Sequence, residues 1–290
     1  MFVCEKDIRE YRWKNSSATT CVGVDKYVQA YKQYSIDSGV TWNDVIPYEY
    51  SATTLIEKES FDCGYSPLAQ SGQPFTIVRE DGEDLFVFSS SYGAEYNVGG
   101  GWYRFIVNPV RVTDKIKIRV STNREPPANI KISGSSYSFE GNIASLYVTD
   151  LSNGTLYLSD DMFGGFFANL EGLKSAKKLY LPIPNYLRRG CYAGMFKGCI
   201  NLEKAPVLYT DRPVQYCYSN MFNGCTSLND IVCLATDISA TFASEKWVNG
   251  VAANGTFHKN PNATVCQSGC TWSTGVNGIP SGWTITDYTG

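Results

Sequence analysis

The chain has 290 residues, of which 43% are hydrophobic and 18% charged, with a formal net charge of −3 at pH 7. No run of Lys or Arg is longer than a pair, so the sequence lacks the basic patch expected of a nucleic-acid-binding protein. The sequence also contains no apolar stretch of about 18 residues that could span a membrane. We therefore expect no nucleic-acid partner and no membrane insertion. If the sequence is complete, its charged start also predicts that no signal peptide exports it.

The first predicted module is an N-terminal β-hairpin module that covers residues 1–65. Residues 27–35 alternate in part, Ser38 and Gly39 supply a turn, and residues 40–42 begin a second strand. Residues 35–45 read Ser-x-Asp-x-Gly-x-Thr-Trp-x-Asp-Val. This pattern resembles a hairpin found in surface and phage-tail proteins of gut Bacteroidetes and their viruses.

Residues 66–140 are predicted to form a small β-sandwich-like domain. Strand-like runs cover residues 75–78, 85–88, 102–107 and 115–120, and Gly-containing turns separate them. The acidic residues 80–84 are interpreted as a charged hairpin turn between two of these strands, rather than as the paired carboxylates of a glycosidase or a calcium site.

Four aromatic residues surround the glycine-rich segment of this domain and are candidate binding residues. They are Tyr92, Tyr96, Trp102 and Tyr103. Side chains of this kind stack on sugars or anchor interfaces, although they are also ordinary strand residues. Both interpretations stay open on the sequence.

Residues 141–245 are predicted to hold about three repeats. Residues 191–199 and 217–225 share six of nine residues at an offset of 26, in the pattern Cys-Tyr-x-x-Met-Phe-x-Gly-Cys. A degenerate copy that includes Phe167 and Leu173 lies 29 residues upstream of the first. We predict that each repeat is a short helix carrying Met-Phe, a glycine turn and a short strand, and that the repeats stack into a short leucine-rich-repeat solenoid closed by a C-terminal cap, residues 246–290.

Because a single repeat cannot bury its own apolar face, the motif residues are predicted to form the core rather than an active site. This predicted repeat core consists of Phe167, Leu173, Tyr192, Met195, Phe196, Cys199, Leu202, Tyr218, Met221, Phe222, Cys225 and Leu228. Gly198 and Gly224 are expected to take a left-handed conformation at a helix end. The five cysteines of the repeats recur at the repeat period, which favours buried thiols over disulfides.

The motif Tyr-x-x-Met-Phe-x-Gly-Cys-x-x-Leu followed by Ala-Pro-x-Leu resembles the BspA-type leucine-rich repeat of Bacteroidetes surface proteins and their phages. The resemblance covers about residues 140–245, and the Trp- and Gly-rich tail is similar to the segment that closes such arrays. It implies a mainly β protein with short helices, acting as a tail fibre or receptor-binding component of a phage virion. The implied partners are other tail proteins and a glycan or protein of the host surface, with a homotrimeric assembly. The alternative is a bacterial cell-surface adhesin.

No residue pattern indicates catalysis. His258 is the single histidine, and spacing nominates no partner for it. Cys266 and Cys270 have the spacing of half a zinc site, yet no second pair follows, so a local disulfide or free thiols are the other interpretations. We expect a non-enzymatic protein with no cofactor and no metal.

Overall fold

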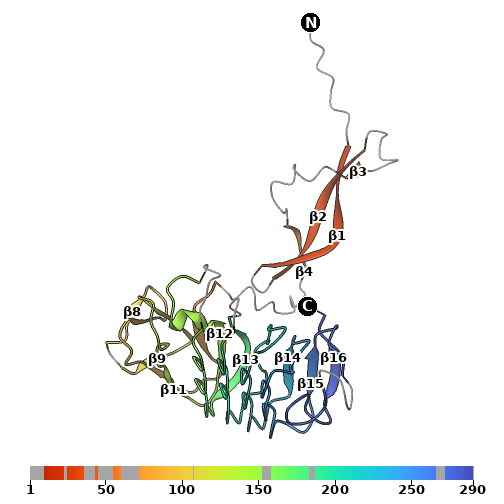
Figure 1. Ribbon diagram of the computed structural model, residues 1–290. Helices are drawn as coiled ribbons and strands as arrows, with labels where there is room; N and C mark the ends of the chain where they lie inside the picture. Colours follow the sequence, from red (N-terminus) through yellow and green to blue (C-terminus); the bar gives the residue numbers. More distant parts are fainter. Residues whose placement is uncertain are drawn as a thin grey trace. The chain divides into compact units, whose positions relative to one another are not determined.

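The computed structural model divides the chain into two compact units, Met1–Ala69 and Gln70–Gly290 (Figure 1). In the first unit it describes the backbone of residues 10–22, 25–35, 43–44 and 55–59. In the second it describes residues 72–106, 108–151, 158–182, 187–265 and 272–289. The chain is mainly β: the 3-10 turn η3 (Ile143–Leu146) is the one helical element within these ranges.

The first unit is an antiparallel sheet of β1 (Glu10–Val22), β2 (Asp25–Ser35), β3 (Asn43–Asp44) and β4 (Leu55–Glu59). Strand β2 pairs with β1, β3 and β4. The predicted strand at 27–35 therefore exists, and β3 pairs with its end. The predicted turn at Ser38 and Gly39 lies outside the described residues. The long β1–β2 hairpin is a feature that the sequence analysis did not predict.

The second unit begins with two groups of strands, which pair antiparallel except for one parallel pair at the edge of the larger sheet. One sheet has the order β13-β12-β5-β10-β7-β8, the other has the order β11-β6-β9, and neither closes on itself. The strands are β5 (Phe75–Arg79), β6 (Leu85–Phe88), β7 (Ala94–Asn97), β8 (Tyr103–Arg104), β9 (Val110–Val112), β10 (Lys115–Val120), β11 (Lys131–Ser133), β12 (Tyr137–Asn142) and β13 (Leu173–Tyr180).

Strand β10 shows why these segments form strands. Its apolar residues Ile116, Ile118 and Val120 are buried, and the cations between them face outward. This period of two is the pattern of a half-buried strand. The predicted hairpin across residues 80–84 is wrong, because β5 pairs with β10 and β12 while β6 pairs with β9 and β11. The acidic turn links two sheets.

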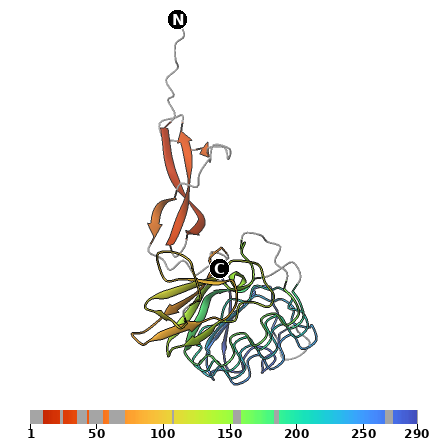
Figure 2. The same ribbon diagram turned by 90° about the vertical axis from the view of Figure 1, so that its left-hand side faces the viewer.

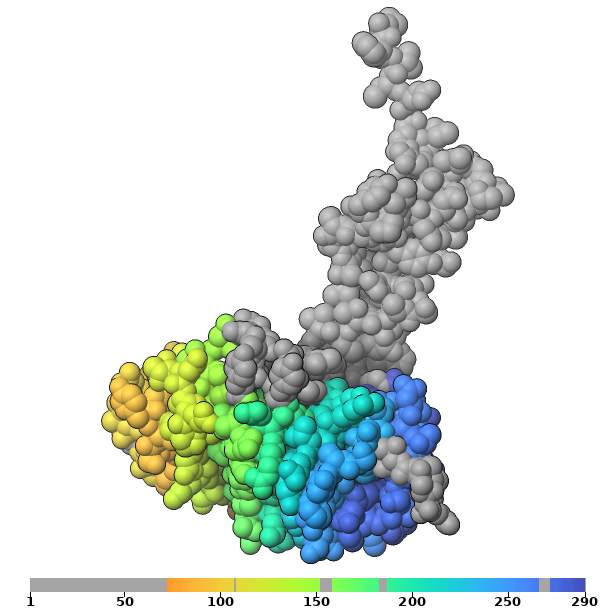
Figure 3. Space-filling model, in the orientation of Figure 1, coloured from red at the N-terminus to blue at the C-terminus, as the bar shows by residue number. Residues whose placement is uncertain are grey.

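The repeat region consists of turns and short parallel strands. Continuous turns cover residues 160–169, 189–198, 215–224 and 241–250, and we call these four segments the turn ladder. Strands β14 (Asp230–Cys233), β15 (Thr256–Lys259) and β16 (Thr284–Asp287) pair in parallel. Figure 2 shows the loops of this region one behind another, and the colour bands of Figure 3 follow the sequence along the second unit.

Hydrogen bonds explain the turn ladder. The N–H of Gly164 donates three residues back to the carbonyl of Asp161 at 2.8 Å, whereas the N–H of Gly165 donates to the next segment, to the carbonyl of Ala193 at 2.7 Å. Along a segment, the backbone N–H groups therefore alternate: one donates to a carbonyl of its own segment, and the following one donates to a carbonyl of the next segment. Every fourth residue has a positive φ: Asp161, Gly165 and Asn169; Gly190, Gly194 and Gly198; Tyr216, Asn220 and Gly224; and Phe242, Lys246 and Gly250.

The predicted short helix at each Met-Phe pair is therefore wrong. A helix needs each N–H to bond four residues back, and here half of the N–H groups bond to a neighbouring segment instead. Gly198 and Gly224 do have left-handed φ values of 75° and 80°, but each ends a series of turns. The fourth segment, 241–250, extends into the predicted C-terminal cap, which was expected to begin at residue 246.

One core runs through the second unit. Strand β12 pairs antiparallel with β5 and parallel with β13, so it joins the antiparallel sheet to the repeats. A series of ring contacts follows the same path, through Phe75, Phe139, Phe167, Phe196, Phe222 and Trp247. The domain boundaries near residues 140 and 245 remain predictions from the sequence. In the structure, one cluster of buried hydrophobic residues extends across both positions.

Candidate ligand-binding hollow

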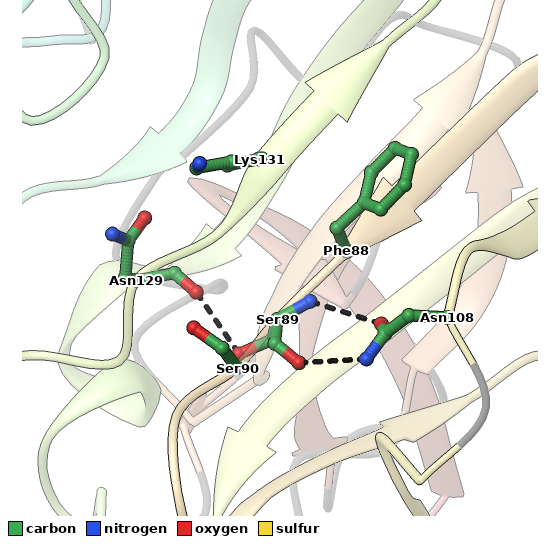
Figure 4. Close-up of a pocket in the computed structure, with 6 residues that line it drawn as sticks. All are labelled: Phe88, Ser89, Ser90, Asn108, Asn129 and Lys131. Atoms are coloured by element: carbon green, nitrogen blue, oxygen red, sulfur yellow. Dashed lines mark hydrogen bonds between the residues drawn. The ribbon is translucent and has the colours of Figure 1, made fainter.

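A hollow of about 230 Å³ lies where the strands of the three-stranded sheet end (Figure 4). Phe88 ends β6, Asn108 lies just before β9, and Lys131 begins β11. Because β6 lies between β9 and β11 in this sheet, residues far apart in the sequence line one hollow. Its lining consists of Phe88, Ser89, Ser90, Asn108, Asn129 and Lys131.

Hydrogen bonds around Ser89 hold the hollow in shape. The Ser89 N–H donates to Oδ1 of Asn108 at 3.2 Å, and Nδ2 of Asn108 donates back to the Ser89 carbonyl at 3.0 Å. The Ser89 hydroxyl donates to the carbonyl of Asn129 at 2.9 Å, and the Asn129 N–H donates to Oγ of Ser91 at 2.9 Å. Ser89 is only 3% exposed, and its bonds to the exposed residues Asn108 and Asn129 tie the strand ends together.

Three polar side chains of the lining have no protein partner within the described ranges: the Ser90 hydroxyl, the Asn129 carboxamide and the Lys131 ammonium (Figure 4). The exposed Lys131 ammonium supplies positive charge, the amide both donates and accepts, and the half-buried Phe88 ring supplies an apolar wall. A few oriented polar groups beside an aromatic ring are typical of a small-ligand site.

The structure does not bring the four predicted aromatic binding residues to this hollow. Tyr96 packs against Tyr103 and Phe105, at ring-centroid distances of 5.9 and 4.9 Å. Tyr92 is 84% exposed. Trp102 lines a second hollow of about 330 Å³, where the Arg119 guanidinium lies 4.0 Å from the centre of its ring.

Arg119 limits what the second hollow can bind. Its guanidinium also donates to Glu95 at 3.1 Å, so it is held over one face of the indole of Trp102. That face is therefore not free to stack on a ligand. Sequence reasoning nominated the aromatic residues and missed the Ser89 hollow, since Ser and Asn after a strand look like ordinary turn residues.

The predicted repeat-core residues lie in the interior, and none of the twelve is more than 2% exposed. The thiol of Cys199 donates to the carbonyl of Phe167 at 3.1 Å, and that of Cys225 donates to the carbonyl of Phe196 at 3.0 Å. The five cysteines of the repeats are free and buried. Burial raises the pKa of Cys199 to about 12, so this thiol is not a nucleophile at neutral pH.

His258 has two partners that spacing alone did not nominate. Its Nδ1 lies 2.8 Å from the Thr286 hydroxyl, and its Nε2 lies 3.4 Å from the Asp230 carboxylate. The three residues come from adjacent parallel strands at an offset of 28 residues. This row links β14, β15 and β16, which is a structural role.

In the described ranges no three His, Cys, Asp or Glu side chains are arranged to hold a metal ion, and no helix there is long and apolar enough to cross a bilayer. Cys266 and Cys270 lie outside the described residues. The chain matches no family model, no curated protein and no solved structure in the comparisons made.

Proposed function

We propose that the chain is a non-enzymatic attachment protein that binds an acidic sugar of a bacterial surface glycan in the Ser89 hollow. The observation that carries this proposal is that Ser90, Asn129 and Lys131, without protein partners in the described ranges, line the same hollow as Phe88. The six lining residues include no carboxylate, histidine or cysteine. The hollow therefore lacks the carboxylate pair of a glycosidase, and we propose it as a binding site.

Each lining group has a task in this proposal. The Lys131 ammonium pairs with the carboxylate of an acidic sugar, because a charged group strengthens a hydrogen bond. The Asn129 amide and the Ser90 hydroxyl bond to ring hydroxyls, and the Phe88 ring covers the apolar face of the sugar. The hydrogen bonds around Ser89 hold these groups in place before the ligand arrives, which lowers the entropic cost of binding.

The setting of this activity follows from the repeat motif. We propose that the turn ladder and its parallel strands are a short leucine-rich-repeat solenoid, and that the chain serves as a tail fibre or receptor-binding component of a phage virion. The other tail proteins would then be its partners and a homotrimer its assembly. Support comes from the recurrence of the same turns in four segments and of the same hydrogen bonds at the three junctions between consecutive segments. A cell-surface adhesin with the same repeats is the alternative.

Calorimetric titration of the full chain with galacturonic acid and with methyl galactoside tests the sugar site. We expect the acid to bind and the neutral glycoside to bind at least tenfold more weakly. Lys131→Ala and Asn129→Ala should each weaken binding of the acid about tenfold. Lys115→Ala removes an exposed lysine of β10 outside the hollow and should leave it unchanged. Equal binding of acid and glycoside, or no binding of the acid, would falsify the assignment of this hollow.

Light scattering of the purified chain, with and without reductant, tests the setting. A trimer that is insensitive to reductant supports the tail-fibre assignment. A monomer that loses stability on reduction contradicts it and favours the adhesin.

A further inference from the structure

Three side chains from consecutive segments of the turn ladder form a row at the surface, which we call the aromatic strip: the exposed Arg189, the half-buried Tyr216 and the exposed Phe242. The Arg189 guanidinium lies 5.2 Å from the centre of the Tyr216 ring. The Tyr216 and Phe242 rings are stacked, with centroids 5.2 Å apart and planes 23° apart. Phe242 is 50% exposed, and it has no other ring contact within the described ranges.

The backbone of the aromatic strip is unfavourable for aromatic residues. Tyr216 and Phe242 have φ values of 59° and 54°, a left-handed conformation that bulky L-residues rarely adopt. The equivalent position in the preceding segments is Asp161 and then Gly190. The ladder can therefore be built with a small residue there.

The core does not explain these two aromatic residues either. The neighbouring side chains of Cys217 and Tyr218 fill the interior of the third segment, where both are at most 2% exposed. Phe242 leaves half of its surface outside. Strained residues that the core does not require are most often kept for function.

Charged groups of both signs continue the row. Arg188 lies 3.8 Å from the Asp160 carboxylate and Arg189 lies 4.0 Å from that of Asp161, and all four side chains are more than half exposed. At these distances each pair is loose. The guanidinium groups can donate, and the carboxylates can accept, toward hydroxyl groups of a ligand without leaving a net charge at the site.

We propose that the aromatic strip binds a neutral glycan chain, one sugar ring of which stacks on the open face of Phe242 and whose hydroxyls bond to the Arg and Asp residues. Tyr216 lies between Arg189 and Phe242 and holds the Phe242 ring in place. A protein partner fits less well, because a stable protein interface buries about 800 Å² on each side and involves roughly 20 to 30 residues. The strip is a narrow row with charged neighbours. It lies on the turn ladder, so this inference does not depend on the Ser89 hollow.

The test uses affinity electrophoresis of the full chain through gels that contain dextran, galactan or hydroxyethyl cellulose, with polygalacturonate as the acidic probe. We expect at least one neutral polysaccharide to retard the protein. Tyr216→Gly and Phe242→Gly should weaken this retardation at least tenfold while the melting temperature stays within a few degrees, because glycine suits the positive φ. Phe242→Leu, which keeps apolar bulk but lacks a flat ring, should weaken it as well.

Lys246→Gly is the matched control, since Lys246 is also exposed and has a φ of 50° but lies outside the strip. It should leave retardation unchanged. The proposal is wrong if no neutral polysaccharide retards the wild-type chain, if the strip variants are retarded like the control, or if both glycine variants melt far below it, which would make the strip a structural stack. Lys131→Ala should not change retardation by the neutral polysaccharides, so failure of the Ser89 assignment and failure of this one are distinguishable.

Discussion

The strands β5–β12 and the turn ladder contribute to one core, but the spacing of their buried residues along the sequence differs. In β10 every second residue is buried, because side chains of a strand alternate between its two faces. In the second, third and fourth segments of the turn ladder, buried residues come in pairs, such as Cys191 with Tyr192 and Met195 with Phe196, and the pairs recur every four residues. The first pattern comes from the pleat of a sheet, and the second from consecutive turns that each bring the chain back to the same side.

The two regions also satisfy their backbone groups differently. The antiparallel strands bond to neighbours through the ladders of two sheets. The turns divide their N–H groups between the same segment and the next one. A turn segment is therefore stable only beside another, which is the physical basis of repeat architectures.

The largest expected effect on stability comes from removing one ring of the shared aromatic core. Phe222 is fully buried and its ring contacts Phe196 and Trp247, at 5.8 and 6.0 Å. Phe222→Ala should lower the free energy of unfolding by about 3 to 5 kcal/mol, as large-to-small changes at buried aromatic residues do. Urea unfolding of the full chain measures this. Tyr92→Ala, at an exposed aromatic residue of the antiparallel region, is the control and should change it by less than about 0.5 kcal/mol.

A loss below about 1 kcal/mol for Phe222→Ala would contradict the continuous core. It would mean that the third and fourth segments contribute little to the stability of the second unit.

Much of the antiparallel region could be predicted from the sequence. Period-two alternation located β5, β6 and β10 within a residue or two. It failed at residues 102–107, where only Tyr103–Arg104 is a strand and residues 105–106 are a turn. It also could not tell which strands pair, because the pairing of β5 with β12 depends on contacts between residues about 60 positions apart.

The turn ladder was misjudged because a period of four is close to the 3.6 residues per turn of an α-helix. The signal that distinguishes the two was present in Gly190, Gly194 and Gly198, which are four residues apart. Three glycines at this spacing are costly in a helix and favourable in consecutive left-handed turns. The Ser89 hollow had no comparable signal, since it forms only where three strand ends meet.

The second expected effect is a loss of stability at alkaline pH, caused by ionisation of buried thiols. It belongs to the repeat region, because residues 72–151 contain no cysteine. Burial raises the pKa of Cys199 and of Cys233 from 9.0 to about 12. The folded thiols keep their protons where the unfolded ones lose them, so stability is full below pH 9 and falls as the pH rises toward 12. The loss should reach roughly 1.4 kcal/mol per thiol at pH 10.

Urea unfolding at pH 8 and pH 10 checks this, with the double variant Cys199→Ala, Cys233→Ala for comparison. The variant should be less stable at pH 8 but should lose about 3 kcal/mol less between the two pH values. An equal loss in both proteins would show that these thiols ionise as easily in the folded chain as in the unfolded one.

The smallest expected effect is the change in stability when a glycine is replaced by alanine, and its sign differs between the two regions. Gly224 has a φ of 80°, and a Cβ added there would lie 3.7 Å from the nearest atom, so space is available and only the backbone conformation opposes a side chain. Gly224→Ala should therefore cost about 1 to 2 kcal/mol. Gly82, in the turn between β5 and β6, has no positive φ and nothing within 4 Å of an added Cβ. Gly82→Ala should instead be neutral or stabilise the protein by up to about 1 kcal/mol, because it restricts the unfolded chain. Thermal unfolding of the two variants measures both signs. A neutral Gly224→Ala would mean that side chains at the left-handed positions of the turn ladder cost little stability, which would also remove the strain argument for Tyr216 and Phe242.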